Sequence, residues 1–153
     1  MSDASSRFLW PPTIYGGAAI AGLALTRAWP LPLPGAGPAS TCLGYALIAL
    51  GCAVALAAEY VFWRAGVNTL PTRPTTTIVA TGIYRVTRNP MYLGMTLALI
   101  GVGLALGSAW FLITTPVCVY AVTKLAIERE EAYLAAKFGA TYLDYKARVR
   151  RWF

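Results

Sequence analysis

Apolar residues occupy most of the chain in long stretches that are interrupted by shorter polar or Pro- and Gly-rich segments. The stretches cover residues 12–28, 39–62, 91–107 and 109–127. A helix needs about 20 mostly apolar residues to cross the roughly 30 Å of hydrocarbon in a bilayer. The pattern therefore predicts an all-α polytopic membrane protein, with four transmembrane helices in a single domain of residues 1–153.

The segments between the apolar stretches indicate how they are connected. Residues 29–38 are rich in Pro and Gly and predict a loop. Gly107 and Ser108 leave room only for a tight turn between the third and fourth helices. Pro90 favours the start of the third helix, since its missing N–H would have no partner in a first helical turn.

The chain after the fourth stretch is polar and splits at Gly139 into two short helical segments, residues 128–138 and 141–153. In the second segment four apolar or aromatic residues recur on one helical face, opposite a basic face. They are Tyr142, Tyr145, Val149 and Trp152. We therefore expect two interfacial helices, the second lying with this face against the membrane surface.

Composition and charge support a membrane protein and give it an orientation. The chain is 58% hydrophobic and 12% charged, against roughly 25% charged residues in soluble domains. With the amino terminus inside, only Arg27 of the 13 Lys and Arg residues falls outside. Because basic residues mark the cytoplasmic side, we expect both termini, the loop of residues 64–90 and residues 128–153 to be cytoplasmic, in a bacterial inner membrane.

The chain lacks histidine, which excludes His-based metal sites and Ser-His or Cys-His nucleophiles. Cys42, Cys52 and Cys118 lie in apolar runs without a CxxC spacing and are interpreted as small lipid-exposed or packing residues. We expect neither a metal site nor a nucleic-acid partner.

One polar constellation precedes the third helix. Arg85 and Arg88 lie close to Tyr84 and Tyr92. They can be membrane anchors in an aromatic belt, or an anion-binding rim in which Arg binds a carboxylate or phosphate near the helix N-terminus. The residues alone leave both interpretations open.

Acidic residues form a second constellation after the fourth helix. Glu128 is explained by an i, i+4 pair with Lys124, whereas Glu130 and Glu131 favour a cationic partner, either arginines or a ligand. Glu59 is an acid inside the second apolar stretch. A structural pair with Arg64 or the Arg85/Arg88 loop is the favoured interpretation for it.

The two constellations together resemble a known family. The segment "TGIYRVTRNPMYLG", two helices and then "EREEAYLAAKFGATYLDYKARVRRWF" look like the isoprenylcysteine carboxyl methyltransferase family and its phospholipid N-methyltransferase relatives, over about residues 66–153. The resemblance implies an integral-membrane methyltransferase that binds S-adenosylmethionine at the cytosolic rim of the membrane.

The same resemblance implies a set of site residues. Arg88, Asn89, Pro90, Tyr92 and Gly94 match the family pattern Arg-His-Pro-x-Tyr-x-Gly, and Glu130 and Glu131 match its paired glutamates. Phe138, Gly139, Tyr142 and Tyr145 match Phe-Gly-x-x-Tyr-x-x-Tyr. The implied cofactor-binding residues are Tyr84, Arg88, Asn89, Pro90, Tyr92, Gly94, Glu130, Glu131, Tyr142 and Tyr145, and the implied catalytic residues are Arg88, Arg148 and Arg151. Asn89 departs from the family histidine, and an amide cannot carry a proton.

The expected reaction is methyl transfer to a lipophilic acceptor that enters from the bilayer, with membrane lipids as the surrounding partners. A carboxylate like that of isoprenylcysteine is favoured, because Arg148, Arg150 and Arg151 could bind it and it needs no base. The alternatives are N-methylation of phosphatidylethanolamine, an NADPH-dependent membrane reductase, and a non-enzymatic four-span transporter or scaffold. The oligomeric state is left open.

Overall fold

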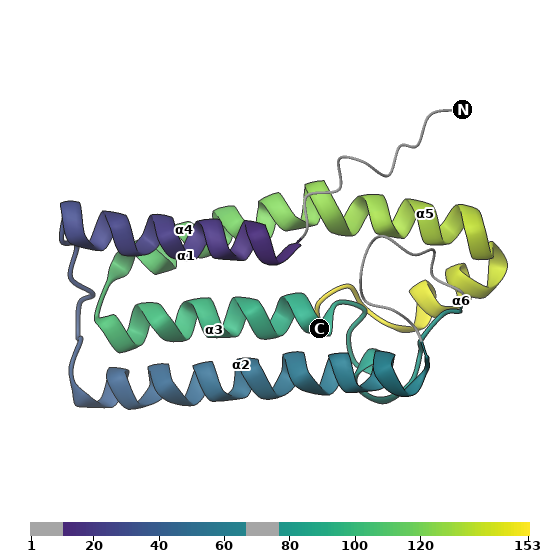
Figure 1. Ribbon diagram of the computed structural model, residues 1–153, viewed down its shortest axis with the longest axis horizontal. Coiled ribbons are helices and arrows are strands. Elements are labelled where there is room, and N and C mark those ends of the chain that lie inside the picture. The colour runs from purple at the N-terminus through teal and green to yellow at the C-terminus, as the bar shows by residue number, and fades with distance from the viewer. Residues whose placement is uncertain (1–10, 67–76) are drawn as a thin grey trace.

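The computed structural model describes residues 11–66 and 77–153, and in this part of the chain the regular elements are all helices (Figure 1). The four long helical segments match the four predicted stretches closely, which confirms the all-α prediction. Their order is α1 (Pro11–Ala28), α2 (Pro38–Arg64), η2 (Gly82–Arg85), α3 (Pro90–Leu106), α4 (Ala109–Val122), η3 (Thr123–Ile127), α5 (Glu128–Phe138) and α6 (Ala140–Arg148).

The helices form one elongated bundle in which α2 packs along α3, α3 packs on α4, and α1 covers α4. The helix of α4 continues through η3 into α5, and α6 then turns back so that the chain ends beside the start of α3 (Figure 1). Residues 77–90, α5, α6 and the tail 149–153 lie at one end of the bundle. We call it the polar end.

Within residues 11–66 and 77–153, two helices are long and apolar enough to cross a membrane. They are α2 (Pro38–Arg64) and the continuous helix Ala109–Phe138, and α3 is a shorter apolar helix. Their length and composition agree with the predicted membrane protein, and the crossing of the membrane by all four helices stays a prediction.

The closest helix contact joins α2 to α3 through glycines. A Cβ atom built on Gly94 would lie 2.5 Å from the carbonyl oxygen of Gly51, and one built on Gly101 would lie 2.6 Å from that of Gly44. Without side chains, the two backbones approach directly, as in membrane helix pairs that use small residues at their interface. These glycines therefore set the spacing of the α2–α3 hairpin.

The connection between α3 and α4 is the predicted tight turn. Gly107 ends α3 in the left-handed conformation, with φ of 61°, which glycine adopts without steric cost. Its carbonyl accepts a hydrogen bond from the Leu33 N–H at 2.8 Å, and the Ser108 hydroxyl bonds that of Thr26 at 2.6 Å. The loop of residues 29–37 is thus joined to this turn.

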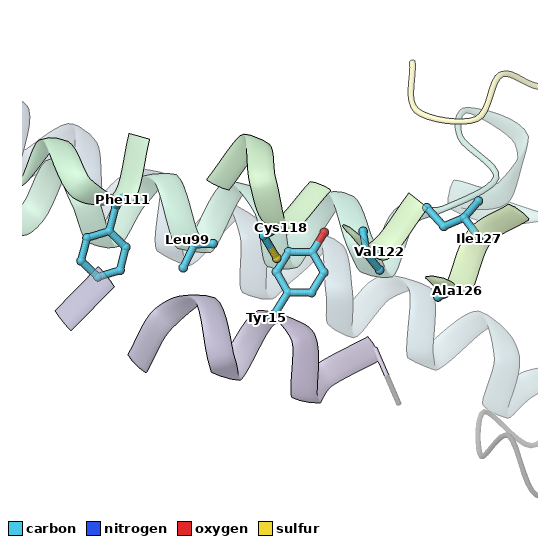
Figure 2. Close-up of a cluster of buried hydrophobic side chains, with 7 residues drawn as sticks. All are labelled: Tyr15, Leu99, Phe111, Cys118, Val122, Ala126 and Ile127. Carbon is cyan, nitrogen blue, oxygen red and sulfur yellow. The ribbon is translucent and has the colours of Figure 1, made fainter. Parts of the chain in front are cut away.

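The main apolar cluster fills the space between α1, α3 and the α4–η3 helix (Figure 2). Its buried members are Tyr15, Leu99, Phe111, Cys118, Val122, Ala126 and Ile127. The Tyr15 hydroxyl donates to the Tyr92 carbonyl at 3.1 Å and shares a 2.8 Å hydrogen bond with Thr96. This cluster holds the first turns of α3 against α4, which positions the polar end. Cys118 has the predicted packing role.

The orientation predicted for the last helix is wrong. Tyr142, Tyr145 and Val149 are buried within the protein and do not face a membrane surface. They pack on residues of α5 and of the segment before η2, namely Ile78, Ala80, Leu134, Ala135 and Phe138. The helix also ends at Arg148, and Trp152 packs against the main apolar cluster. The aromatic face is buried because α6 turns back onto α5.

Candidate functional site

The turn before α3 holds the C-terminal tail. The Arg88 N–H donates to the Arg150 carbonyl at 3.0 Å. The side chains of Thr87 and Asn89 both donate to the carbonyl of Arg151, at 3.0 Å and 2.9 Å. Residues about 60 positions apart in sequence are therefore fixed side by side. Asn89, at the position of the family histidine, is buried and uses its amide for this contact.

Glu131 forms the centre of a charge cluster at the same place. Its carboxylate accepts two hydrogen bonds from Arg151, both at 2.9 Å, and one from Arg88 Nη1 at 2.9 Å. The Lys146 ammonium lies 3.4 Å away. Because the side chains of Glu131 and Arg88 are each only 9% exposed, this ion pair is largely shielded from water.

The cluster keeps Glu131 ionised. Burial alone would raise the pKa of this carboxyl group, but the hydrogen bond from Arg151 and the charges of Arg88, Arg151 and Lys146 outweigh it. The net effect lowers the pKa. Glu131 is thus a structural anion, and its carboxylate oxygens accept hydrogen bonds from the Arg88 and Arg151 side chains.

The π-helix η3 brings Glu131 to this position. A π turn takes up an extra residue compared with an α turn. Ala126 and Ile127 are therefore both fully buried, and Glu131 is buried farther along the same helix. The π-helix joins the apolar part of this long helix to its polar part.

Glu130 differs from its neighbour. It is exposed, and within the described residues its side chain forms no ion pair or hydrogen bond. Its charge nevertheless acts on the surrounding tyrosines. Burial, and after it the charge of Glu130, raises the pKa of Tyr84. Desolvation, and after it the charge of Glu131, raises the pKa of Glu130, so a cationic ligand beside these tyrosines would stabilise its ionised form.

The tyrosines of α6 and η2 complete this region. Tyr145 donates its hydroxyl hydrogen to the Tyr84 carbonyl at 2.7 Å, and burial raises the pKa of Tyr145 to about 12. The Tyr142 hydroxyl accepts from Arg88 at 3.3 Å. The Tyr84 ring meets that of Phe62 edge to face at 4.9 Å. These contacts join α6 to η2 and α2.

Comparison with known proteins supplies the class of chemistry. A family model described as phospholipid methyltransferase matches residues 39–141, which include Arg88 and Glu131 of the charge cluster. The chain belongs to the phospholipid methyltransferase family. An uncharacterized protein of Haemophilus influenzae (strain ATCC 51907 / DSM 11121 / KW20 / Rd) is 39% identical over 62 residues, which are 40% of this chain and 98% of that relative. No solved structure matches the chain.

As a membrane methyltransferase, the protein brings many of the predicted site residues to one place. Hydrogen bonds join Arg88, Asn89, Glu131, Tyr142 and Arg151 in one network at the polar end. Tyr84 and Tyr145 adjoin it through the ring contact between Tyr145 and Tyr142. Pro90 starts α3 as predicted, and Gly94 packs on α2. Tyr92 packs against the main apolar cluster.

Arg148 does not join this network. It is exposed and donates to the Asp144 carbonyl within α6. One predicted ion pair is confirmed. Lys124 and Glu128 form the expected i, i+4 ion pair, at 2.8 Å. Gly103, in the apolar "GVGLALG" run, packs closely on Phe111.

Sequence reasoning missed Lys146 and Thr87 in this methyltransferase. Lys146 follows Tyr142 by one helical turn, so it shares the face that meets Arg88 and Glu131. Thr87 is buried, and its hydroxyl accepts from the Asn89 N–H at 3.2 Å. A threonine two residues before an Asn-Pro pair is the signal that could have indicated this local turn.

Proposed function

We propose that the protein transfers the methyl group of S-adenosylmethionine to a lipophilic acceptor, at a site on the polar end that faces the cytoplasm. The observation that supports the cofactor site is the contrast between two adjacent acids. Glu131 is saturated by three basic side chains, whereas Glu130 is exposed and unpaired in the described chain. Of these two acids, Glu130 is therefore the one whose carboxylate is available to a cationic ligand.

The groups present fit the chemistry of the cofactor. S-adenosylmethionine carries a sulfonium and an ammonium, together with a carboxylate and ribose hydroxyls. The Glu130 carboxylate suits the ammonium or the ribose. The nearby aromatic rings of Tyr84, Tyr92 and Tyr142 suit a sulfonium or an adenine ring. When bound, the cofactor supplies an activated methyl group for in-line displacement.

For such a displacement the protein mainly has to align its ligands. The network of Arg88, Glu131 and Arg151 contributes by holding η2, α3, α5 and the tail in fixed positions. Arg88 and Arg151 thus act in our proposal as positioning residues. An amine acceptor must first lose its ammonium proton to a base, such as a nearby carboxylate. Its nitrogen lone pair then forms the bond to the methyl carbon while the carbon–sulfur bond breaks and sulfur keeps that electron pair.

The acceptor follows from the charges that remain available. The expectation of a prenylcysteine-like carboxylate relied on Arg151 and on an aromatic face at the membrane. Arg151 is instead paired with Glu131, and that face is buried. These two changes remove the main support for a carboxylate acceptor, so we propose an amine-bearing phospholipid such as phosphatidylethanolamine. The carboxylate acceptor is the rival proposal, which the exposed Arg148 and Arg150 would serve.

Calorimetric titration of the purified protein with S-adenosylhomocysteine and with NADPH tests the cofactor. We expect saturable binding of S-adenosylhomocysteine and none of NADPH. Binding of NADPH alone would favour a membrane reductase. Binding of neither compound would favour a transporter or scaffold, and either result would overturn the proposal.

A radiolabelled methyl assay in detergent tests the acceptor, with phosphatidylethanolamine and an isoprenylcysteine supplied in parallel. We expect base-stable label in phosphatidyl-N-methylethanolamine. A base-labile methyl ester on the isoprenylcysteine, without labelled phospholipid, would establish the rival acceptor.

A further inference from the structure

The end of α2 at the polar end carries a patch in which two aromatic rings lie between opposite charges. The patch consists of Glu59, Tyr60, Trp63 and Arg64, which are all exposed. Because residues three or four positions apart are neighbours on a helix surface, the four side chains share one side of α2. The rings of Tyr60 and Trp63 stack with their centroids 6.0 Å apart. We call this surface the α2 patch.

The arginine of the patch folds back along the helix. Its guanidinium carbon lies 6.0 Å from the centroid of the Tyr60 ring, one helical turn before Arg64. Long helical side chains point towards the N-terminus of their helix in this way. The positive charge is therefore brought close to the level of Glu59, which precedes Tyr60 in the sequence. An acid and a guanidinium thus flank the same aromatic pair.

The surroundings of the patch suit a lipid. α2 is long and apolar enough to cross a membrane, and little of its apolar stretch is buried. Leu56, which is 69% exposed, lies on the same side of α2, one turn before Tyr60. Trp and Tyr gather at the depth of lipid headgroups, and an acid in an apolar stretch marks a functional site by default. A ligand of this surface can lay its apolar part along α2 and its polar part on the patch.

The two charges of the patch fit a zwitterionic headgroup. An arginine binds phosphate through its planar fork of N–H groups. A carboxylate attracts an ammonium group and can accept several hydrogen bonds at once, and aromatic faces attract cations. Phosphatidylethanolamine carries a phosphate and a primary ammonium in one headgroup, whereas phosphatidylglycerol carries the phosphate without the ammonium. Charge complementarity therefore favours phosphatidylethanolamine.

The patch adjoins the candidate functional site through η2. The ring of Phe62, at the same end of α2, meets the Tyr84 ring edge to face at 4.9 Å. Burial is the largest cause of the raised pKa of Tyr84, and the charges of Glu130 and Glu59 both add to it. Because a Coulomb interaction weakens with distance, Tyr84 lies near both carboxylates, one on α5 and one on α2.

We propose that the α2 patch binds the headgroup of phosphatidylethanolamine, with the phosphate at Arg64 and the ammonium at Glu59, and so docks the methyl acceptor beside Tyr84. The role as an acceptor site rests on the proposed function, whereas binding of the lipid requires no turnover. The two exposed acids then serve different ligands, Glu59 the acceptor and Glu130 the cofactor.

Single substitutions remove one property of the patch at a time. Glu59→Gln removes the negative charge, Arg64→Gln removes the guanidinium, and Trp63→Leu removes a ring but keeps an apolar side chain. All the substituted positions, those of the controls included, are exposed, so the variants should fold, which thermal unfolding in detergent checks. The matched controls change the same kinds of side chain elsewhere and are Asp144→Asn, Arg27→Gln and, on α2 itself, Tyr45→Leu.

The first experiment measures lipid affinity by native mass spectrometry, with phosphatidylethanolamine and phosphatidylglycerol in parallel. The wild type and the controls should prefer phosphatidylethanolamine. Glu59→Gln should reduce this preference about fivefold, as loss of an exposed charge pair does, and Arg64→Gln should weaken the binding of both lipids. Absence of a preference in the wild type, or an unchanged one in Glu59→Gln, would overturn the proposal. So would a changed oligomeric mass in Trp63→Leu with unchanged lipid affinities, which would identify the patch as a contact between copies.

The second experiment separates the acceptor from the cofactor. In the methyl transfer assay Glu59→Gln should raise the KM for phosphatidylethanolamine about fivefold. Its affinity for S-adenosylhomocysteine, measured by calorimetric titration, should equal that of the wild type. A wild-type KM in Glu59→Gln would overturn the assignment of the patch as the acceptor site. Selective binding of phosphatidylethanolamine without methyl transfer would contradict the proposed function and leave the lipid site established.

Discussion

The α2–α3 hairpin and the polar end are held together in opposite ways. In the hairpin, Gly51 and Gly94 let two backbones touch, and the contact consists of atoms without charge. At the polar end, Glu131 gathers Arg88, Arg151 and Lys146 from three separate segments. The close packing of the hairpin requires glycines without side chains, and the structure of the polar end requires particular charged side chains.

This difference separates framework from site. A backbone contact leaves no room for a larger residue and no adjustable group, so the hairpin is a rigid support. A charge cluster can be weakened one interaction at a time, by substitution or by protonation. Substitutions or protonation at the polar end should therefore lower the stability of the protein gradually. In the hairpin, a substitution should either leave the stability unchanged or unfold the protein.

The largest effect is expected for Gly94→Leu. The new side chain would meet the backbone of α2, which cannot move aside, so the two helices must separate. We expect a destabilisation above about 3 kcal/mol, beyond ordinary overpacking, measured by thermal unfolding in detergent. Gly16→Leu, at an exposed glycine where a Cβ atom would meet no atom within 4 Å, is the control and should unfold like the wild type. A folded Gly94→Leu protein of wild-type stability would show that the hairpin is not a rigid support.

The second effect is expected for Glu131→Gln. The substitution leaves the buried Arg88 guanidinium and its partner Arg151 without their anion. Breaking a buried ion pair costs about 3 to 5 kcal/mol, and we expect a loss near the lower limit, because Gln keeps one acceptor. Glu128→Gln, which removes the exposed pair with Lys124 and a longer, 3.9 Å contact with Arg151, should cost about 1 kcal/mol or less. Equal losses in both variants would contradict a structural role for Glu131.

The hairpin and the helices were largely predictable from the sequence, and the site was so only in part. Helix starts and ends follow from local chemistry, such as Pro90 at the first turn of α3 and Gly107 in its left-handed cap. The gathering of Arg88, Glu131 and Arg151 could be expected as a set. Which of Glu130 and Glu131 is paired could not, since it depends on the register that η3 imposes on α5.

The burial of the α6 aromatic face escaped prediction for a related reason. A face of Tyr142, Tyr145 and Val149 has the same periodicity whether it meets lipid or protein. The reversal of direction at Gly139, which lays α6 on α5, decides between them. The local pattern therefore predicts the amphipathic helix, and tertiary structure determines what covers it.

Acid should weaken the polar end before the hairpin. The pKa of Glu131 is lowered in the folded state, so its stabilising contribution is present above the unfolded-state pKa of about 4.3. This contribution is lost as the pH falls through the lower folded-state pKa. Thermal unfolding should thus show a midpoint that falls with pH below about 4.3, and Glu131→Gln should flatten this dependence. A dependence of equal slope in Glu131→Gln would assign it to other groups.

Glu130→Gln should have the smallest effect on stability and a clear effect on ligand binding. Its side chain contributes no ion pair within the described residues, so the unfolding midpoint should stay at the wild-type value. Removing its charge should weaken S-adenosylhomocysteine binding about tenfold or more, as loss of one charge-assisted hydrogen bond does. Calorimetric titration measures this, with Glu128→Gln as the control for charge at the same surface.

Because Glu130 and Glu131 are adjacent, comparing the two Gln variants distinguishes the ligand-binding acid of this motif from the structural one. If Glu130→Gln binds like the wild type, the available carboxylate of this motif has no part in holding the cofactor.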